Sequence, residues 1–175
     1  PDTASRHRFV ATGVWEFPIG RGKAIGGGIS NALDAVVGGW QVAGTFSYRS
    51  GNLLSFGAMI APESVEVLGG KGRKAYWFDT TGFKALPAYT RRTNPINYED
   101  VRGPSFNNLD LVLSKQVSLG GRRSLQFRLE AYNALNHINY ADPVVSITSS
   151  DFGRTNSLYA GTAGRRLVYN FRFEF

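Results

Sequence analysis

The glycine-rich stretch GRGKAIGGG, residues 20–28, is the first place where the sequence could carry chemistry. Glycine backbone amides together with a lysine can bind phosphate groups. The stretch lacks the Gly-Lys-Ser/Thr order of a phosphate-binding loop, so we interpret it as a turn between strands. The two histidines, His7 and His137, lie far apart in the chain without the spacing of a metal site. No Gly-x-Ser-x-Gly motif occurs and no carboxylate pair is placed to share a cleft. We therefore expect no enzyme, no metal site and no cofactor.

A group of aromatic and cationic residues in one long segment could bind a ligand. Aromatic rings stack on sugars, and arginines bind anions. The alternative is that the rings pack the segment onto itself as a compact cap. The candidate ligand residues are Tyr76, Trp77, Phe78, Tyr89, Arg91 and Arg92.

The composition indicates short strands joined by turns rather than helices. The 175 residues are 42% hydrophobic and include 21 Gly, 12 Phe and 8 Tyr, but one Met and no Cys. No run of about 18 apolar residues is present, which excludes a membrane-spanning helix but not a membrane-spanning strand. The net charge of +7 is spread along the chain, so we expect no nucleic-acid partner.

Apolar and polar residues alternate with a period of two in five stretches, which predicts five strands of an all-β, antiparallel up-and-down meander. The stretches are 8–17, 40–49, 108–119, 124–135 and 166–175. The predicted apolar face carries Trp40, Val42, Phe46, Leu109, Leu111, Leu113, Leu125, Phe127, Leu129, Tyr169, Phe171, Phe173 and Phe175. The predicted polar face carries Asp110, Arg128, Glu130, Asn170, Arg172 and Glu174.

The connections between these strands alternate in length. Residues 120–122, GGR, have the composition of a tight hairpin turn. Residues 18–39 are intermediate in length, and Ser30 is placed to cap a short helix that Gly38 and Gly39 end. Residues 56–104 and 136–164 are long and rich in Gly, Pro, Asn, Ser and Thr. Membrane barrels have this wiring, with tight turns in the periplasm and long loops outside.

Two environments explain a sheet with one apolar and one polar face. In a soluble sandwich the apolar face is the core, whereas in a membrane barrel it meets lipid and the polar face lines the lumen. Aromatic residues lie near both sets of strand ends, as expected of two lipid interfaces. They are Trp15, Phe17, Trp40 and Phe175 near one set, and Tyr48, Phe106 and Tyr140 near the other.

Several segments together carry a resemblance to a known family. They are RHRFVATGVWEFPIGRGK, GGWQVAGTFSYRSGNLLSF, VRGPSFNNLDLVLSKQ, LQFRLEAYNALNHINYADP, FGRT and NFRFEF, in this order over nearly the whole chain. This set resembles the C-terminal portion of TonB-dependent outer-membrane receptors, in particular the large Oar-like group. The resemblance implies that residues 1–175 are part of a larger barrel of about 22 strands, without the N-terminal plug domain of that family. It also implies that Tyr169, Phe171, Phe173 and Phe175 form the signal read by the barrel assembly machinery.

By this resemblance, the chain is a segment of an outer-membrane receptor for TonB-driven uptake of a large nutrient. Five strands alone cannot close a barrel, so we expect no transport by this segment by itself. Its expected partners are outer-membrane lipid, the assembly machinery, and either the rest of the barrel or further copies at the open sheet edges. The TonB system would act only through the missing N-terminal part.

Two alternatives remain open from the sequence. One is a released fragment that assembles edge to edge into a secreted or cell-surface fibre or ring. The other is a soluble β-sandwich that binds carbohydrate through its aromatic loops. The chain begins with Pro1, which indicates a processed product or a piece of a larger chain. Five strands would place Pro1 outside the cell and Phe175 in the periplasm.

Overall fold

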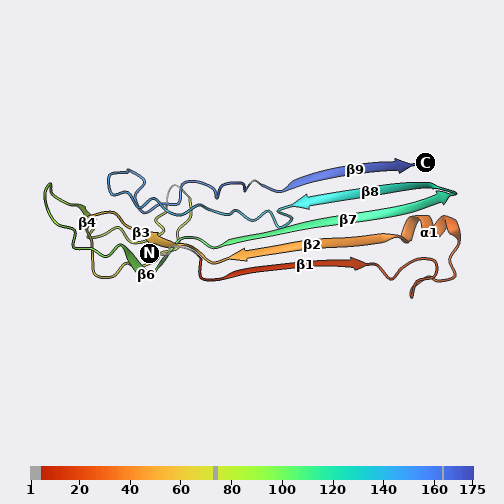
Figure 1. Ribbon diagram of the computed structural model, residues 1–175, viewed down its shortest axis with the longest axis horizontal. Coiled ribbons are helices and arrows are strands. Elements are labelled where there is room, and N and C mark those ends of the chain that lie inside the picture. Colours follow the sequence, from red (N-terminus) through yellow and green to blue (C-terminus); the bar gives the residue numbers. More distant parts are fainter. Residues whose placement is uncertain (1–4, 73–74, 163) are drawn as a thin grey trace. The chain divides into compact units, whose positions relative to one another are not determined.

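Five long strands form one antiparallel sheet in a computed structural model that describes residues 5–72, 75–162 and 164–175 (Figure 1). The strands are β1 (Arg8–Glu16), β2 (Trp40–Arg49), β7 (Phe106–Gly120), β8 (Arg123–Tyr132) and β9 (Arg166–Glu174). Their order in the sheet, β1-β2-β7-β8-β9, is the order along the chain among these five. The predicted up-and-down meander is confirmed. The prediction that Pro1 lies outside the cell concerns a residue outside the described ranges.

The register keeps each kind of side chain on one face of the sheet. Leu113 pairs with Leu129, which pairs with Tyr169, while Ser114 pairs with Arg128, which pairs with Asn170. Because successive side chains of a strand point to opposite faces, this register continues the two predicted faces across β7, β8 and β9.

The two shorter connections have the predicted local structure. Gly120 and Gly121, with φ of 88° and 63°, make the turn between β7 and β8, because glycine adopts positive φ without steric strain. Helix α1 (Asn31–Val37) begins after Ser30, whose hydroxyl accepts a hydrogen bond from the Leu33 amide at 3.3 Å. Gly38 donates its amide to the Asp34 carbonyl at 2.8 Å and closes the helix.

The chain divides into two compact units. The sheet unit comprises the described residues of 10–47, 108–137 and 163–175, and the loop unit those of 1–9, 48–107 and 138–162. The loop unit contains four short strands in two antiparallel pairs, which the sequence did not predict. They are β3 (Leu53–Ser55) with β6 (Asn97–Arg102), and β4 (Met59–Ile60) with β5 (Lys84–Ala85).

The buried hydrophobic core of the described chain lies within the loop unit. It consists of Leu54, Phe56, Met59, Trp77, Phe78, Phe83, Tyr98, Val101 and Phe152. Phe78 is fully buried, and its ring lies 5.4 Å from that of Phe56 and 5.5 Å from that of Phe152. Aromatic burial of this kind is a major stabilising contribution, so the long connections form a folded unit rather than open loops.

Candidate functional site

The apolar face of the sheet unit is exposed over much of its area. The exposed fractions are 58% for Trp15, 59% for Tyr169 and 73% for Phe171. The ring of Phe127 lies 6.5 Å from Trp40 and 5.2 Å from Phe171, so aromatic side chains meet across the strands. All thirteen residues predicted for this face lie on β2, β7, β8 or β9 or, for Phe175, directly after β9. A protein in water rarely exposes an apolar surface of this extent without a partner for it.

The opposite face carries ion pairs and hydrogen bonds along its strands. Arg128 Nε lies 2.8 Å from Glu130 Oε1, and the Tyr132 hydroxyl donates to Glu130 Oε2 at 2.6 Å. On β9, Arg172 Nη2 lies 2.8 Å from Glu174 Oε1. These predicted polar residues pair mainly within their own face, so the charges on it are largely balanced.

A further predicted residue of the polar face, Asp110, has a structural role. Its Oδ1 accepts a hydrogen bond from the Asn133 amide at 2.8 Å. Asn133 has a positive φ of 49°, and its side chain bonds the amide and the carbonyl of His137, both at 2.9 Å. Asp110 therefore fixes the turn that follows β8. Asn170 lies on the same face, opposite Arg128.

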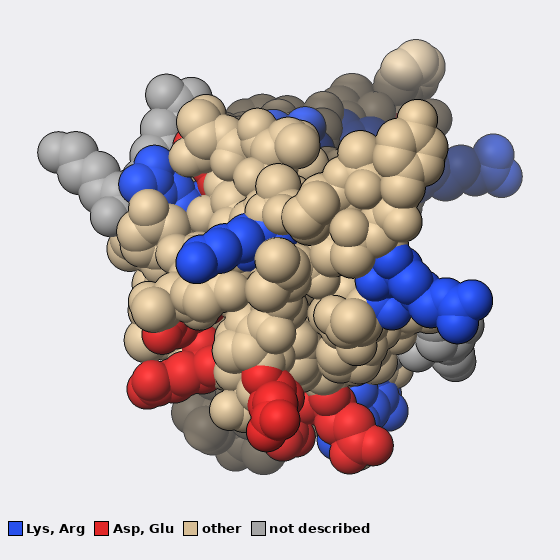
Figure 2. All heavy atoms as spheres, turned by 90° about the vertical axis from the view of Figure 1, so that its left-hand side faces the viewer, with Lys and Arg blue, Asp and Glu red and all other residues tan. Residues whose placement is uncertain are grey.

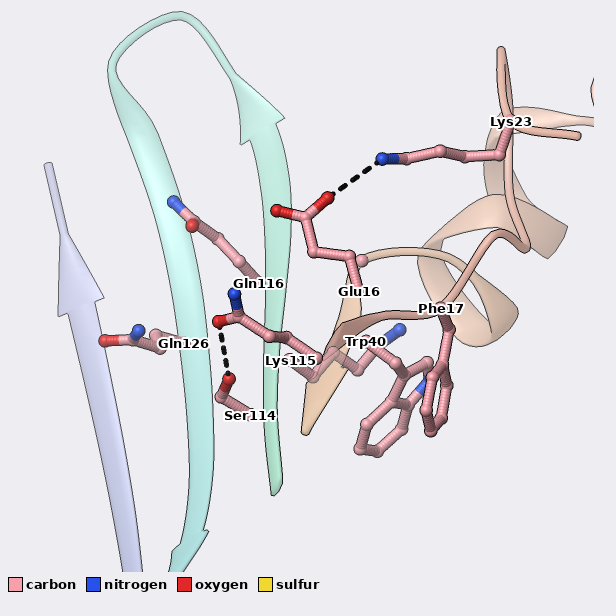
Figure 3. Close-up of a pocket in the computed structure, with 10 residues that line it drawn as sticks. Glu16, Phe17, Lys23, Trp40, Ser114, Lys115, Gln116 and Gln126 are labelled. Atoms are coloured by element: carbon pink, nitrogen blue, oxygen red, sulfur yellow. Dashed lines mark hydrogen bonds and ion pairs between the residues drawn. The ribbon is translucent and has the colours of Figure 1, made fainter. Parts of the chain in front are cut away.

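A pocket of about 200 Å³ opens on the sheet unit beside the turn between β1 and β2 (Figure 3). Lys23 Nζ lies 3.1 Å from Glu16 Oε2, and the Ser114 hydroxyl donates to Gln41 Oε1 at 3.5 Å. The dashed lines in Figure 3 mark these two interactions. The amide side chains of Gln41, Gln116 and Gln126 also line the pocket. The sequence prediction missed this pocket, although Gln41, Ser114, Gln116 and Gln126 all stand at polar positions of the alternating pattern in their strands.

Lys115 is the exception to the apolar face. It pairs with Phe127 in the register, and its Nζ lies 4.8 Å from the centre of the Trp40 ring. In the alternating stretch 108–119, position 115 falls among the apolar positions. The sequence alone could therefore have shown that Lys115 lies on the apolar face.

The structure corrects the candidate ligand loop at two positions. Trp77 is 9% exposed and Phe78 is fully buried, so both belong to the core of the loop unit and cannot present their rings to a ligand. The Trp77 indole donates to the Arg102 carbonyl at 2.7 Å. Packing of the rings within the segment, the alternative considered from the sequence, accounts for these two residues.

The other four candidates are distributed over the surface of the loop unit. Arg92 donates to the backbone carbonyls of Phe56, Pro95 and Asn94 at 2.8–2.9 Å, which engages its guanidinium in the fold. The Arg154 guanidinium lies over one face of the Tyr76 ring, 4.7 Å from the ring centre, and the Tyr76 side chain is still 38% exposed. Tyr89 and Arg91 are also exposed, and a ligand role for Tyr76, Tyr89 and Arg91 stays a prediction.

The charged surface around these loops does not gather into one cationic site. Figure 2 shows the face that carries β4 and β6, where acidic side chains gather along one margin and Lys and Arg are scattered among neutral residues. Among the described residues, no group of three or more His, Cys, Asp or Glu side chains could hold a metal ion. The described part of the chain also contains no helix with the length and hydropathy to cross a membrane.

Comparison with known families identifies the class of protein. The family model of the outer membrane beta barrel domain matches residues 2–168. The chain belongs to this family. No curated protein and no solved structure matches it. The barrel domain is part of a transmembrane β-barrel of the bacterial outer membrane, which confirms the predicted fold class and location.

For this barrel domain, the soluble sandwich was the wrong alternative. In a sandwich the apolar faces of the strands would form the buried core, but the buried hydrophobic residues of the described chain belong to the loop unit. An exposed apolar face is instead the property that a membrane barrel requires of its strands.

Proposed function

We propose that this barrel domain is a segment of a TonB-dependent receptor that takes up a large nutrient across the outer membrane. The observation that carries the proposal is the register of the sheet, which places apolar and polar side chains on separate faces in a family of outer-membrane barrels. The receptor class and the Oar-like group rest on the resemblance of the quoted segments.

In this proposal the apolar face is in contact with lipid and the polar face lines the lumen. Hydrocarbon cannot hydrogen-bond charged side chains, so they face the interior of a membrane barrel. The ion pairs Arg128–Glu130 and Arg172–Glu174 and the amides of the pocket would then lie on the lumen side. The lipid side would carry the residues of the apolar face, from Trp40 on β2 to Phe173 on β9.

Two single-cysteine variants test the assignment of the faces. The sequence contains no cysteine, so Arg128→Cys and Leu129→Cys each give one labelling site in this segment, on adjacent residues of β8. With a fluorophore attached in the full-length protein in bilayers, we expect lipids with brominated acyl chains to quench the label at position 129 and not at 128. Equal quenching at both positions, or stronger quenching at 128, would overturn the assignment.

The alternating aromatic residues of β9 are proposed as the segment read by the barrel assembly machinery. Tyr169, Phe171 and Phe173 lie on one face and are more than half exposed, and Phe175 is 93% exposed. A machinery that recognises a strand can therefore reach these rings before lipid covers them.

The receptor proposal is tested on the full-length protein in its native membrane. An antibody to residues 170–175 should detect a band several times heavier than 19.2 kDa in outer-membrane fractions, and chemical crosslinking in cells should join this band to TonB. A band of 19.2 kDa in large secreted particles would instead establish the self-assembling fragment. An outer-membrane band that does not crosslink to TonB would reject the receptor proposal and indicate an outer-membrane barrel of another class.

A further inference from the structure

Lys115 places a positive charge among the apolar side chains at one end of the sheet. It lies between Leu113 and Val117 on the apolar face of β7, five residues before the end of the strand at Gly120. A lysine on the lipid side of a barrel is strongly unfavourable in the middle of the bilayer and tolerated near the interfaces. If the apolar face meets lipid, as proposed above, Lys115 must therefore lie close to an interface.

The Lys115 ammonium is bound to the end of helix α1. Its Nζ donates to the carbonyl oxygens of Val36 at 2.9 Å and of Gly38 at 2.6 Å. The Trp40 indole donates to the same Val36 carbonyl at 3.1 Å. Free carbonyls at the C-terminal end of a helix carry partial negative charge, which favours a cation there. These three bonds fasten α1 to the apolar side of the strand ends.

The rest of α1 presents apolar side chains outward. Leu33 is 49% exposed and Val36 is 66% exposed, and Ile25 in the same connection is 57% exposed. The polar residues of the helix are engaged with the connection itself. Asp34 Oδ1 accepts the Arg21 amide at 2.6 Å, and Asn31 Oδ1 accepts the Arg21 guanidinium. Nothing in the described chain covers the outward side chains of α1.

We propose that α1 and Lys115 form a phospholipid anchor, in which Leu33 and Val36 enter the boundary between headgroups and acyl chains. The inference rests on the proposed lipid contact of the apolar face, since Lys115 and Trp40 hold the end of α1 against that face, beside residues 116–120 of β7. Interfacial helices bury apolar side chains at this depth and keep their polar side toward water.

Charge supports lipid as the occupant. The hairpin between β7 and β8 lies beyond Lys115 at the same end of the sheet and carries Arg122 and Arg123, both exposed. In the proposed orientation these two arginines extend toward the phosphate groups of the lipids. Lysine also places its ammonium at this level when its stem lies along apolar surface. The third donor of the Lys115 ammonium is then available to a lipid phosphate.

Depth-dependent quenching tests the anchor in the full-length protein in bilayers. Leu33→Cys carries a fluorophore on the outward side of α1, and Ala35→Cys carries it on the opposite side of the same helix as the matched control. Leu129→Cys serves as the reference for lipid contact of the sheet. Phospholipids labelled with a quencher on the headgroup, or bromine on the acyl chain, report the depth of each label.

We expect at least threefold stronger quenching by headgroup and upper acyl-chain quenchers at position 33 than at 35. Lipid quenching at 129 without any difference between 33 and 35 would overturn the anchor and leave the barrel proposal standing. No lipid quenching at 129 would overturn both. A label at 33 that is protected from lipid and water alike would show that a protein, not lipid, covers α1.

Discussion

At the residue scale, two glycines of the loop unit lie where backbone segments meet without space for a side chain. A Cβ on Gly51 would lie 1.8 Å from the Gly103 carbonyl oxygen, and a Cβ on Gly103 would lie 2.0 Å from Asp142 Oδ1. The Gly103 amide also donates to the Asn52 carbonyl at 2.8 Å. Glycine is required here for close approach, not for an unusual φ.

Gly51→Ala is therefore expected to destabilise the loop unit by about 1–3 kcal/mol, because the backbone of residue 103 cannot move without losing this hydrogen bond. Gly57→Ala is the matched control, since a Cβ there would meet nothing within 4 Å. The measurement is urea-dependent protease resistance of the loops in the full-length protein. Equal resistance of the two variants would contradict the steric explanation.

Tyr98 gives the loop unit a dependence on alkaline pH. Its ring belongs to the core, and its hydroxyl donates to the Pro62 carbonyl at 2.8 Å. Burial raises the pKa of Tyr98 above the ordinary tyrosine value, and the charge of Arg92 opposes this shift. Since the folded state holds the proton more tightly than the unfolded state, the stabilisation is complete below the unfolded pKa of about 10 and is lost as the pH rises through the folded pKa.

The expected result is that stability of the loop unit falls above pH of about 10 in the wild type, and that Tyr98→Phe removes this fall. At neutral pH the variant should lose about 1 kcal/mol with the hydrogen bond. Ultraviolet absorbance of tyrosinate, compared between the two proteins, locates the titration of Tyr98. An unchanged alkaline profile in Tyr98→Phe would assign the effect to another group.

At the element scale, α1 is stabilised mainly by hydrogen bonds to its last carbonyls, because the helix itself is short. Seven residues make a helix that is marginal in water. The Ser30 hydroxyl accepts a hydrogen bond from an amide of the first turn. Lys115 and Trp40 donate hydrogen bonds to a carbonyl of the last turn. The bond from an ammonium to a carbonyl is stronger than one between neutral groups, so Lys115 carries most of this contribution.

Lys115→Met keeps the apolar stem and removes the ammonium. We expect amide hydrogen exchange in 34–38 to accelerate by about tenfold, as a charged hydrogen bond contributes about 1.5–3 kcal/mol. The sheet itself should keep or gain stability in bilayers, because Met suits a lipid-facing position better than Lys. Lys84→Met, at an exposed lysine of β5, is the control, and equal exchange rates in the two variants would contradict the role given to Lys115.

At the scale of the whole molecule, the sheet has two edges, β1 and β9. Edge strands carry backbone donors and acceptors that must be paired in a membrane, where water does not reach them. In an outer-membrane barrel, further strands pair with both edges and close the lumen. The two edges therefore support the proposal that these five strands are a segment of a larger sheet, completed by the same chain or by other copies.

Phe175→Ser tests the proposed role of β9 in assembly. A polar residue at this position should remove the heat-modifiable band of the full-length protein from the outer-membrane fraction, because the aromatic pattern read by the assembly machinery would be interrupted. Tyr89→Ser is the control, since it replaces a fully exposed aromatic residue in the loop unit. Normal assembly of the Phe175→Ser variant would show that Phe175 is not part of an assembly signal.

The sequence by itself determined the five strands, their two faces, the hairpin turn and the capped helix. Each of these depends on local rules, such as the period of two along a strand, positive φ at Gly120 and Gly121, or a hydroxyl at an N-cap. The bounds of β2, residues 40–49, were predicted without error for the same reason.

The tertiary structure alone decided which residues far apart in sequence meet. The sequence could not place Phe78 against Phe56 and Phe152, because irregular loops have no periodicity to show which rings are buried. It could not join Lys115 to the carbonyls of α1, 77 and 79 positions away, because that bond depends on the pairing of β2 with β7. Local patterns fix the direction of a side chain, whereas its partner is fixed by the folded chain as a whole.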